Sequence, residues 1–257
     1  MEFEFFKYQG TGNDFIIIDN RSLFFPKNDT KLIVQLCDRK FGIGADGLLL
    51  LEDHETADFR MVYFNSDGKL SSMCGNGGRC IVHLARKLGI IQEFATFEAI
   101  DGTHEATIES DIVSLKMSDV NEVEISNNHV FLNTGSPHHV TMVDNLSDFD
   151  VYSEGKKIRN DLYGREGANI NFVSPISKSA FAVRTYERGV EDETLSCGTG
   201  VTAVAIAMHA MVKTESQKIE LRTPGGTLEV RFKKIDKGYQ NVYLTGPATF
   251  VFKGHWK

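Results

Sequence analysis

Two short stretches with one shared pattern guide the interpretation of this sequence: Met73-Cys74-Gly75-Asn76-Gly77-Gly78-Arg79 and Ser196-Cys197-Gly198-Thr199-Gly200-Val201-Thr202. In each stretch a cysteine and a Gly-x-Gly precede an apolar run. Cys197 follows Cys74 by 123 positions. The same offset pairs Thr11-Gly12 with Thr134-Gly135, Gly44-Ala45 with Gly167-Ala168, Tyr63 with Tyr186, and Gly102 with Gly225. A constant offset over most of a half-chain indicates a duplicated unit.

Composition limits the classes of protein to consider. The 257 residues carry a net charge of −7 and no Lys/Arg block, which argues against nucleic acid as the main partner. The acidic N-terminus is unlike a signal peptide, and no apolar run is long enough to span a bilayer. We therefore expect no membrane partner. The four cysteines form no CxxC pair, so we expect no metal site and free thiols in a cytoplasmic protein.

Residue periodicity predicts the main elements of the fold. A short helix is expected over 31–37, an amphipathic helix over 78–88, a further helix within 148–161 and a helix apolar on every side over 201–212. Strands fill the remaining apolar stretches. The pattern favours an α/β (α+β) fold of two pseudo-symmetric halves, each a mixed or antiparallel sheet wrapped around a buried central helix.

A boundary between the halves is expected in the polar stretch that follows residue 118. The first half then covers residues 1–118 and the second covers 119–247. The last strand, within 248–257, has no counterpart at the end of the first half. We therefore expect it to cross back to the sheet of the first half.

A cysteine beside a helix start has a specific chemistry. The unpaired N–H groups and the positive end of the helix dipole stabilise an anion, so they favour a thiolate and can also bind a carboxylate. Neither Cys74 nor Cys197 has a histidine in its own loop, as a catalytic-cysteine hydrolase would need. Two matched thiols favour two-base racemisation or epimerisation, which requires no cofactor in principle. Cys37 and Cys80 lack this context and are expected in the core.

These motifs closely resemble the diaminopimelate epimerase family. The resemblance spans nearly the whole chain and rests on Lys7–Phe15 (KYQGTGNDF), Phe41–Gly47 (FGIGADG), Asn65–Gly68 (NSDG), Met73–Gly77 (MCGNG), Tyr186–Gly189 (YERG) and Glu193–Gly200 (ETLSCGTG). It implies two α/β halves with the active site in the cleft between them. It also implies cofactor-independent interconversion of LL- and meso-2,6-diaminopimelate, a small-molecule substrate, in lysine and cell-wall precursor synthesis. A homodimer is compatible with the resemblance alone.

The resemblance also implies roles for individual residues. Cys74 and Cys197 would be the two bases, and Glu187 and His138 would tune the thiols or hold the amino group. The backbone N–H groups at two positions of each loop would hold the reacting carboxylate, namely Gly75, Asn76, Gly198 and Thr199. The remaining substrate contacts would come from Asn13, Asn65, Asn169 and Arg188, of which Arg188 suits a carboxylate because a guanidinium donates two N–H groups at once.

The sequence departs from the family pattern at two positions and leaves two alternatives open. Ser136 stands where Asn is common, and Gly47 stands where Gln is common, so Gly47 supplies no side chain for a substrate contact. The first alternative is a proline or hydroxyproline racemase, which typically has His in place of Asn76. The second is a non-catalytic small-molecule binding module on the same scaffold.

Overall fold

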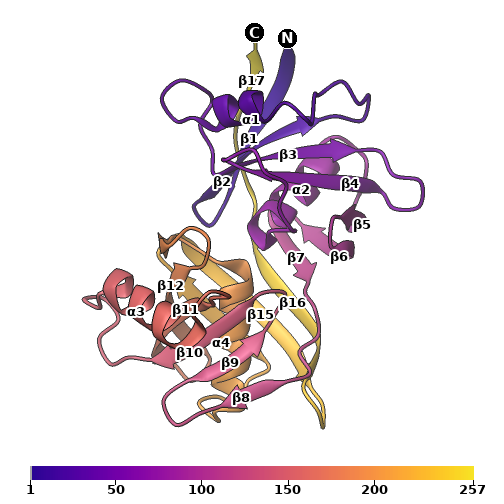
Figure 1. Ribbon diagram of the computed structural model, residues 1–257. Coiled ribbons are helices and arrows are strands. Elements are labelled where there is room, and N and C mark those ends of the chain that lie inside the picture. The colour runs from indigo at the N-terminus through magenta and orange to yellow at the C-terminus, as the bar shows by residue number, and fades with distance from the viewer. Residues whose placement is uncertain (1) are drawn as a thin grey trace. The chain divides into compact units, whose positions relative to one another are not determined.

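The computed structural model describes residues 2–257, and its contacts divide the chain into two compact units. The first comprises Met1–Leu115 and Gly246–Lys257, and the second comprises Lys116–Thr245. Both units contain helices and a mixed sheet, which confirms the predicted α/β fold class (Figure 1). Among residues 2–257 no helix has the length and apolar character needed to cross a membrane.

The first unit contains two helices and eight strands. Its helices are α1 (Thr30–Cys37) and α2 (Gly75–Lys87). Its strands are β1 (Phe3–Gly10), β2 (Asn13–Asp19), β3 (Gly47–Glu52), β4 (Phe59–Asn65), β5 (Phe94–Ala99), β6 (Gly102–Glu109), β7 (Ile112–Lys116) and β17 (Thr249–Trp256). The C-terminal strand β17 pairs antiparallel with β1, with Phe3 opposite Trp256, so the two chain ends lie side by side (Figure 1).

The second unit contains two helices and nine strands. Its helices are α3 (Val151–Tyr163) and α4 (Gly198–Ala210). Its strands are β8 (Val123–Ile125), β9 (Val130–Asn133), β10 (Pro137–Met142), β11 (Asn169–Ser177), β12 (Ala180–Glu187), β13 (Asp192–Thr194), β14 (Lys218–Thr223), β15 (Gly226–Lys234) and β16 (Tyr239–Pro247). The short strands β8 and β13 were not expected from the sequence, because three residues carry no readable alternation.

Strand pairing follows the same scheme in both units. In the first unit the order is β17-β1-β2-β3-β4-β5-β6-β7, with parallel pairs at β2–β3 and β4–β5. In the second it is β8-β9-β10-β11-β12-β14-β15-β16, with parallel pairs at β10–β11 and β12–β14. Helices α2 and α4 begin at residues 75 and 198, again 123 positions apart. The duplication indicated by the sequence is thus present in the topology.

Helices α2 and α4 are the buried central helices. Ten of the thirteen residues of each are buried. In α4 the buried positions surround the helix, because its side chains beyond the first turn are almost all small or aliphatic. Cys37 and Cys80 are also buried, and burial raises the pKa of each thiol to about 12, so both are core residues as expected.

Helix α3 packs on the sheet of the second unit through a glycine. A β-carbon built on Gly155 would lie 2.4 Å from Cβ of Tyr186 on β12. No side chain fits that gap, so Gly155 permits the close approach of α3 to β12 despite its poor helix propensity.

Replacement of Gly155 by alanine should therefore destabilise the protein, although alanine is the better helix former. We expect Gly155→Ala to lower the free energy of unfolding by about 1–3 kcal/mol through overpacking against Tyr186. Lys157→Ala, an exposed change in the same helix, is the matched control and should alter stability by no more than about 0.5 kcal/mol. Urea denaturation measures both; a Gly155→Ala protein at least as stable as the wild type would contradict the packing argument.

Candidate functional site

Cys74 is the N-cap residue of α2. Its backbone is extended, with φ −100° and ψ 126°, and its side chain makes no capping hydrogen bond. Gly78 N–H donates to the Cys74 carbonyl at 2.7 Å, so the helix begins at once. The first N–H groups of a helix have no acceptor within it, and the Cys74 sulfur does not cap those of α2.

Cys197 has the same position on α4. Its φ is −116° and its ψ is 114°, and its side chain likewise makes no capping bond. Its Sγ lies 3.5 Å from the Thr199 hydroxyl, and the Thr199 carbonyl accepts a hydrogen bond of 2.9 Å from the Thr134 hydroxyl. Both cysteines thus lie at the electropositive end of a buried helix, as the sequence predicted for each loop.

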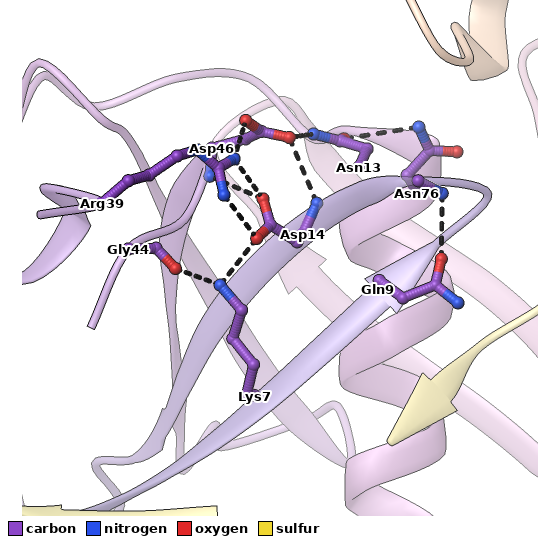
Figure 2. A network of polar contacts seen from close by, with 9 residues as sticks. Lys7, Gln9, Asn13, Asp14, Arg39, Gly44, Asp46 and Asn76 are labelled. Atoms are coloured by element: carbon purple, nitrogen blue, oxygen red, sulfur yellow. Dashed lines mark hydrogen bonds and ion pairs between the residues drawn. The ribbon is translucent and has the colours of Figure 1, made fainter. Parts of the chain in front are cut away.

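Two side-chain amides, of Asn13 on β2 and Asn76 on α2, form a hydrogen-bonded relay beside Cys74. Asn13 Oδ1 lies 3.6 Å from Cys74 Sγ, which donates to it, and 3.3 Å from the Asn76 amide nitrogen. The Asn13 amide nitrogen donates to Asp46 Oδ2 at 2.7 Å. Because an ionised carboxylate can only accept hydrogen bonds, Asp46 holds the NH₂ end of the Asn13 amide (Figure 2), which leaves the amide oxygen toward the Cys74 thiol.

Asp46 belongs to a charged network that sequence analysis did not single out. Arg39 Nη2 contacts Asp14 Oδ1 and Asp46 Oδ1, each at 2.7 Å. Lys7 Nζ lies 2.7 Å from Asp14 Oδ2 and also donates to the Gly44 carbonyl (Figure 2). Burial alone would raise the pKa of Asp14, but the hydrogen bonds and charges of Arg39 and Lys7 outweigh it and hold that pKa at about 2. The network contains two cations and two anions and therefore balances its own charge.

His138 is fully buried on β10 of the second unit. Its Nδ1 lies 3.2 Å from the amide nitrogen of Asn171, which also donates to the His139 carbonyl at 2.9 Å. That amide nitrogen is a donor, so Nδ1 of His138 accepts and Nε2 carries the proton. Nε2 has no hydrogen-bond partner among the described residues. Burial, with a smaller contribution from Arg188, lowers the pKa of His138 to about 3, so the ring is neutral.

Asn169, Ser136 and Arg188 form one polar cluster in the second unit. Asn169 donates from Nδ2 to Ser136 Oγ at 3.1 Å and accepts from the Arg188 backbone N–H at 2.8 Å. Arg188 Nη2 donates to Ser136 Oγ at 3.4 Å, and Nη1 donates to the Glu166 carbonyl at 3.1 Å. Within residues 2–257 no carboxylate pairs with Arg188, whose side chain is exposed. The guanidinium is thus oriented by neutral acceptors and retains its charge for an anionic ligand.

Asn65 and Glu187 lie at the ends of their strands. Asn65 is the last residue of β4, opposite Gly47, and is exposed. Glu187 is the last residue of β12 and accepts a 2.8 Å hydrogen bond at Oε2 from Thr194 on β13. Both side chains therefore lie at the rim of their sheets.

Comparison with known proteins agrees with these motifs. The family model "Diaminopimelate epimerase" matches residues 5–123 and 130–251. A diaminopimelate epimerase of Flavobacterium psychrophilum is 63% identical over 250 residues, covering 96% of this chain and 98% of that protein. One from Chlorobaculum tepidum is 43% identical over 256 residues, covering 95% and 98%.

The chain belongs to the diaminopimelate epimerase family. Members are isomerases, so the chain is an enzyme of that class. Solved structures add a likeness of fold. A phenazine biosynthesis protein of the PhzF family from Bacillus anthracis has a TM-score of 0.79 at 16% identity, covering 100% of this chain and 99% of that one. A hydroxyproline epimerase from Agrobacterium vitis has a TM-score of 0.68 at 13% identity, covering 99% and 92%.

The structure gives a reason for the departure from the diaminopimelate epimerase pattern at Gly47. A β-carbon built there would lie 2.5 Å from Cε2 of Tyr63 and 2.7 Å from the Phe64 carbonyl oxygen. The Tyr63 ring therefore occupies the space that a larger residue at 47 would need. At the other departure, Ser136 keeps a hydrogen bond to Asn169 and another to Arg188, so a hydroxyl takes part where an amide is common in this family.

Sequence analysis missed Arg39, Asp46 and Asn171 as neighbours of the site. Asp46 was quoted within a family motif, and its spacing from Asn13 is 33 residues, which no local pattern connects. Asn171 follows Asn169 by two residues on β11, so the period of a strand was the one available sign that both face the same side.

The lowered pKa of Asp14 predicts a specific pH dependence of stability. Its pKa of about 2 in the folded state lies below its ordinary value of 3.8, so its stabilisation is complete above about pH 4 and is lost as the pH falls toward 2. Asp14→Asn should lower the free energy of unfolding by about 1–2 kcal/mol at pH 7 and have a diminishing effect below pH 4. Asp236→Asn, an exposed change, is the control. Equal losses at pH 7 and pH 2.5 would contradict this prediction.

Proposed function

We propose that this enzyme interconverts LL-2,6-diaminopimelate and meso-2,6-diaminopimelate without a cofactor, using Cys74 and Cys197 as its acid/base pair. The observation that carries the proposal is the equivalent placement of the two cysteines, each at the N-cap of a buried helix, in a chain of this family. The reaction would serve lysine and cell-wall precursor synthesis in the cytoplasm. A homodimer forms part of the same proposal.

In the proposed reaction one cysteine is a thiolate and the other a thiol. The thiolate takes the proton from the α-carbon, and the electron pair of the broken C–H bond passes into the neighbouring carboxylate. The thiol then gives its proton to the opposite face of the same carbon. One proton is taken and one is returned, so no oxidant or reductant is needed, and the cysteines exchange protonation states in each turnover.

Helix termini supply the stabilisation that such a carbanion needs. Charge that develops on the reacting carboxylate is stabilised by N–H groups that already point at it. The N–H groups of Gly75 and Asn76 on α2, and of Gly198 and Thr199 on α4, begin their helices directly after the cysteines. We assign them to the reacting carboxylate for that reason.

The distant end of diaminopimelate is itself an amino acid, with a carboxylate and an ammonium group. Arg188 fits that carboxylate because its charge has no acidic partner within residues 2–257. Asn13 presents its amide oxygen to Cys74, Asn169 lies in the polar cluster with Ser136 and Arg188, and Asn65 lies at a strand end. We assign these residues to substrate binding and Glu187 and His138 to the protonation of the thiols or the binding of the amino group.

A proline or hydroxyproline racemase remains the second candidate because the hydroxyproline epimerase of A. vitis shares the fold. Asn76, where that class typically has His, favours diaminopimelate. Incubation of the protein with LL-diaminopimelate and, separately, with L-proline in D₂O tests the two. We expect deuterium at the α-carbon of diaminopimelate, detected by mass spectrometry and ¹H NMR; incorporation into proline alone would reject the proposal.

Loss of either proposed base should stop epimerisation. We expect Cys74→Ala and Cys197→Ala each to lower kcat by at least about 10³-fold, since each removes a proton carrier that no neighbour replaces. Cys37→Ala, which changes a buried thiol outside both loops, is the matched control and should retain activity in the folded protein. A non-catalytic binding module predicts unchanged ligand binding in all three variants and no turnover in the wild type, so the assay separates the two hypotheses.

A further inference from the structure

Arg79 is a fully buried cation one turn into α2. Its side chain is 0% exposed and belongs to the helix that Cys74 begins. Its guanidinium donates to the carbonyls of Pro247 at 3.3 Å and Gly75 at 3.2 Å. It also donates to Thr11 Oγ1 at 3.4 Å and Asn76 Oδ1 at 3.0 Å. All four acceptors are neutral.

Within residues 2–257 no carboxylate pairs with Arg79. The ionisable groups close enough to influence it are the thiols of Cys74 and Cys80. Burial lowers the pKa of the guanidinium, but arginine remains protonated in proteins. Burying a charge without a counterion costs free energy, so an ionisable group close to Arg79 is stabilised in its anionic form.

Two aspartates near the Cys74 loop, Asp46 and Asp101, do not neutralise Arg79. Asp46, which contacts Asn13, already pairs with Arg39 in the charge-balanced network of Figure 2. Asp101 accepts from the Met73 backbone N–H at 3.4 Å and pairs with His104, and its side chain is 41% exposed, so solvent screens it.

Two further groups near α2 remain neutral. Cys80 and Tyr8 stay protonated near neutral pH because burial raises the pKa of each. Arg79 is thus a buried cation without a carboxylate partner among residues 2–257, and its guanidinium contacts the two residues that directly follow Cys74, the Gly75 carbonyl and the Asn76 amide.

The second unit has no such cation at the equivalent position. The offset of 123 residues brings Arg79 onto Thr202 of α4, a buried hydroxyl that donates to the Gly198 carbonyl at 2.9 Å. His138, a buried base of that unit, is neutral, and the cation that acts on it, Arg188, is exposed to solvent. The two cysteines thus share a backbone conformation at a helix start. They differ in that α2 carries a buried cation where α4 carries a buried hydroxyl.

We propose that Arg79 is a positioning residue that acts as the buried countercharge of Cys74, stabilises its thiolate relative to that of Cys197, and fixes the Asn76 amide at the start of α2. The assignment deepens the proposed function, on which its catalytic meaning rests. It specifies the thiolate of the resting enzyme. Asn76 Oδ1 accepts from Arg79, so its amide nitrogen points at Asn13 Oδ1, and the relay is fixed at one end by a cation and at the other by Asp46.

One contact opposes the thiolate. Cys74 Sγ donates to Asn13 Oδ1 at 3.6 Å, which favours the protonated thiol. A thiol is a weak donor, whereas a nearby opposite charge shifts a pKa by about 1–3 units. The cation and the helix terminus act in the same direction, so together they outweigh this hydrogen bond.

Alkylation of the cysteines without substrate tests the proposal. Short pulses of iodoacetamide between pH 5 and 10, under reductant and with peptide mapping, give a separate midpoint for Cys74 and for Cys197, because the thiolate is the form that reacts. In the wild type we expect the Cys74 midpoint to lie below about 8.5, the value of a free thiol, and below that of Cys197. The thiols of Cys37 and Cys80 stay protonated over most of this range, since their pKa values are about 12.

Variants of Arg79 separate its charge from its packing. In Arg79→Met the Cys74 midpoint should rise by about one to two pH units while that of Cys197 stays in place. Arg79→Lys keeps the cation and should keep the wild-type midpoint. Arg86→Met removes a positive charge from the exposed last turn of the same helix and is the matched control, with no shift expected.

Two outcomes would overturn the assignment. One is a folded Arg79→Met protein with an unshifted Cys74 midpoint. The other, which needs no variant and so holds even where Arg79→Met does not fold, is a wild-type Cys74 midpoint at or above that of Cys197. The readout is independent of turnover. A shifted midpoint without epimerisation would reject the proposed function alone, and epimerisation with an unshifted midpoint would reject the role of Arg79 alone.

Discussion

A helix that is buried along its sides can present only its ends to a ligand, and that constraint organises both units of this protein. Sheets cover α2 and α4 on most sides, so the unpaired N–H groups and the positive end of each dipole are the polar parts that remain accessible. Each helix begins directly after a cysteine whose side chain does not cap it. The sulfur and the anion-binding N–H groups therefore lie together in each unit as a result of the backbone alone.

The two units share this backbone arrangement and differ in the side chains around it. The offset of 123 residues pairs Asn13 with Ser136, Asp46 with Asn169, Asn65 with Arg188 and Arg79 with Thr202. The first unit surrounds its cysteine with a charged but balanced network and one unpaired buried cation. The second has amides and hydroxyls, a neutral histidine, the carboxylate of Glu187 and the exposed Arg188. Equivalent backbones suit a reaction that treats the two faces of one carbon alike, whereas different side chains suit a substrate whose two ends must be distinguished.

Local patterns predicted much of the fold because they reflect short-range physics. The apolar surface of α4, the spacing of Ile81, Leu84 and Leu88 along α2, and the Pro-Gly-Gly turn before β15 are visible within a few residues. The burial of Cys37 and Cys80 was expected because neither cysteine precedes a Gly-x-Gly at the start of a helix. The three-residue strands β8 and β13 were not predicted. Their strand conformation depends on pairing with β9 and β12, and their own residues carry no strand pattern.

The sequence by itself determined the duplicated frame, the family, and the placement of a cysteine at the start of each central helix, since all of these depend on spacing along the chain. Tertiary structure decided which charges are paired. Asp46 contacts Arg39 and Asn13, and Tyr63 fills the space beside Gly47. Arg79 is buried with no carboxylate partner in the described part of the chain, although its position in a helix next to glycines gave no sign of it. Such outcomes depend on strand register and on residues tens of positions apart, so the electrostatics of the site arise only when the sheet assembles.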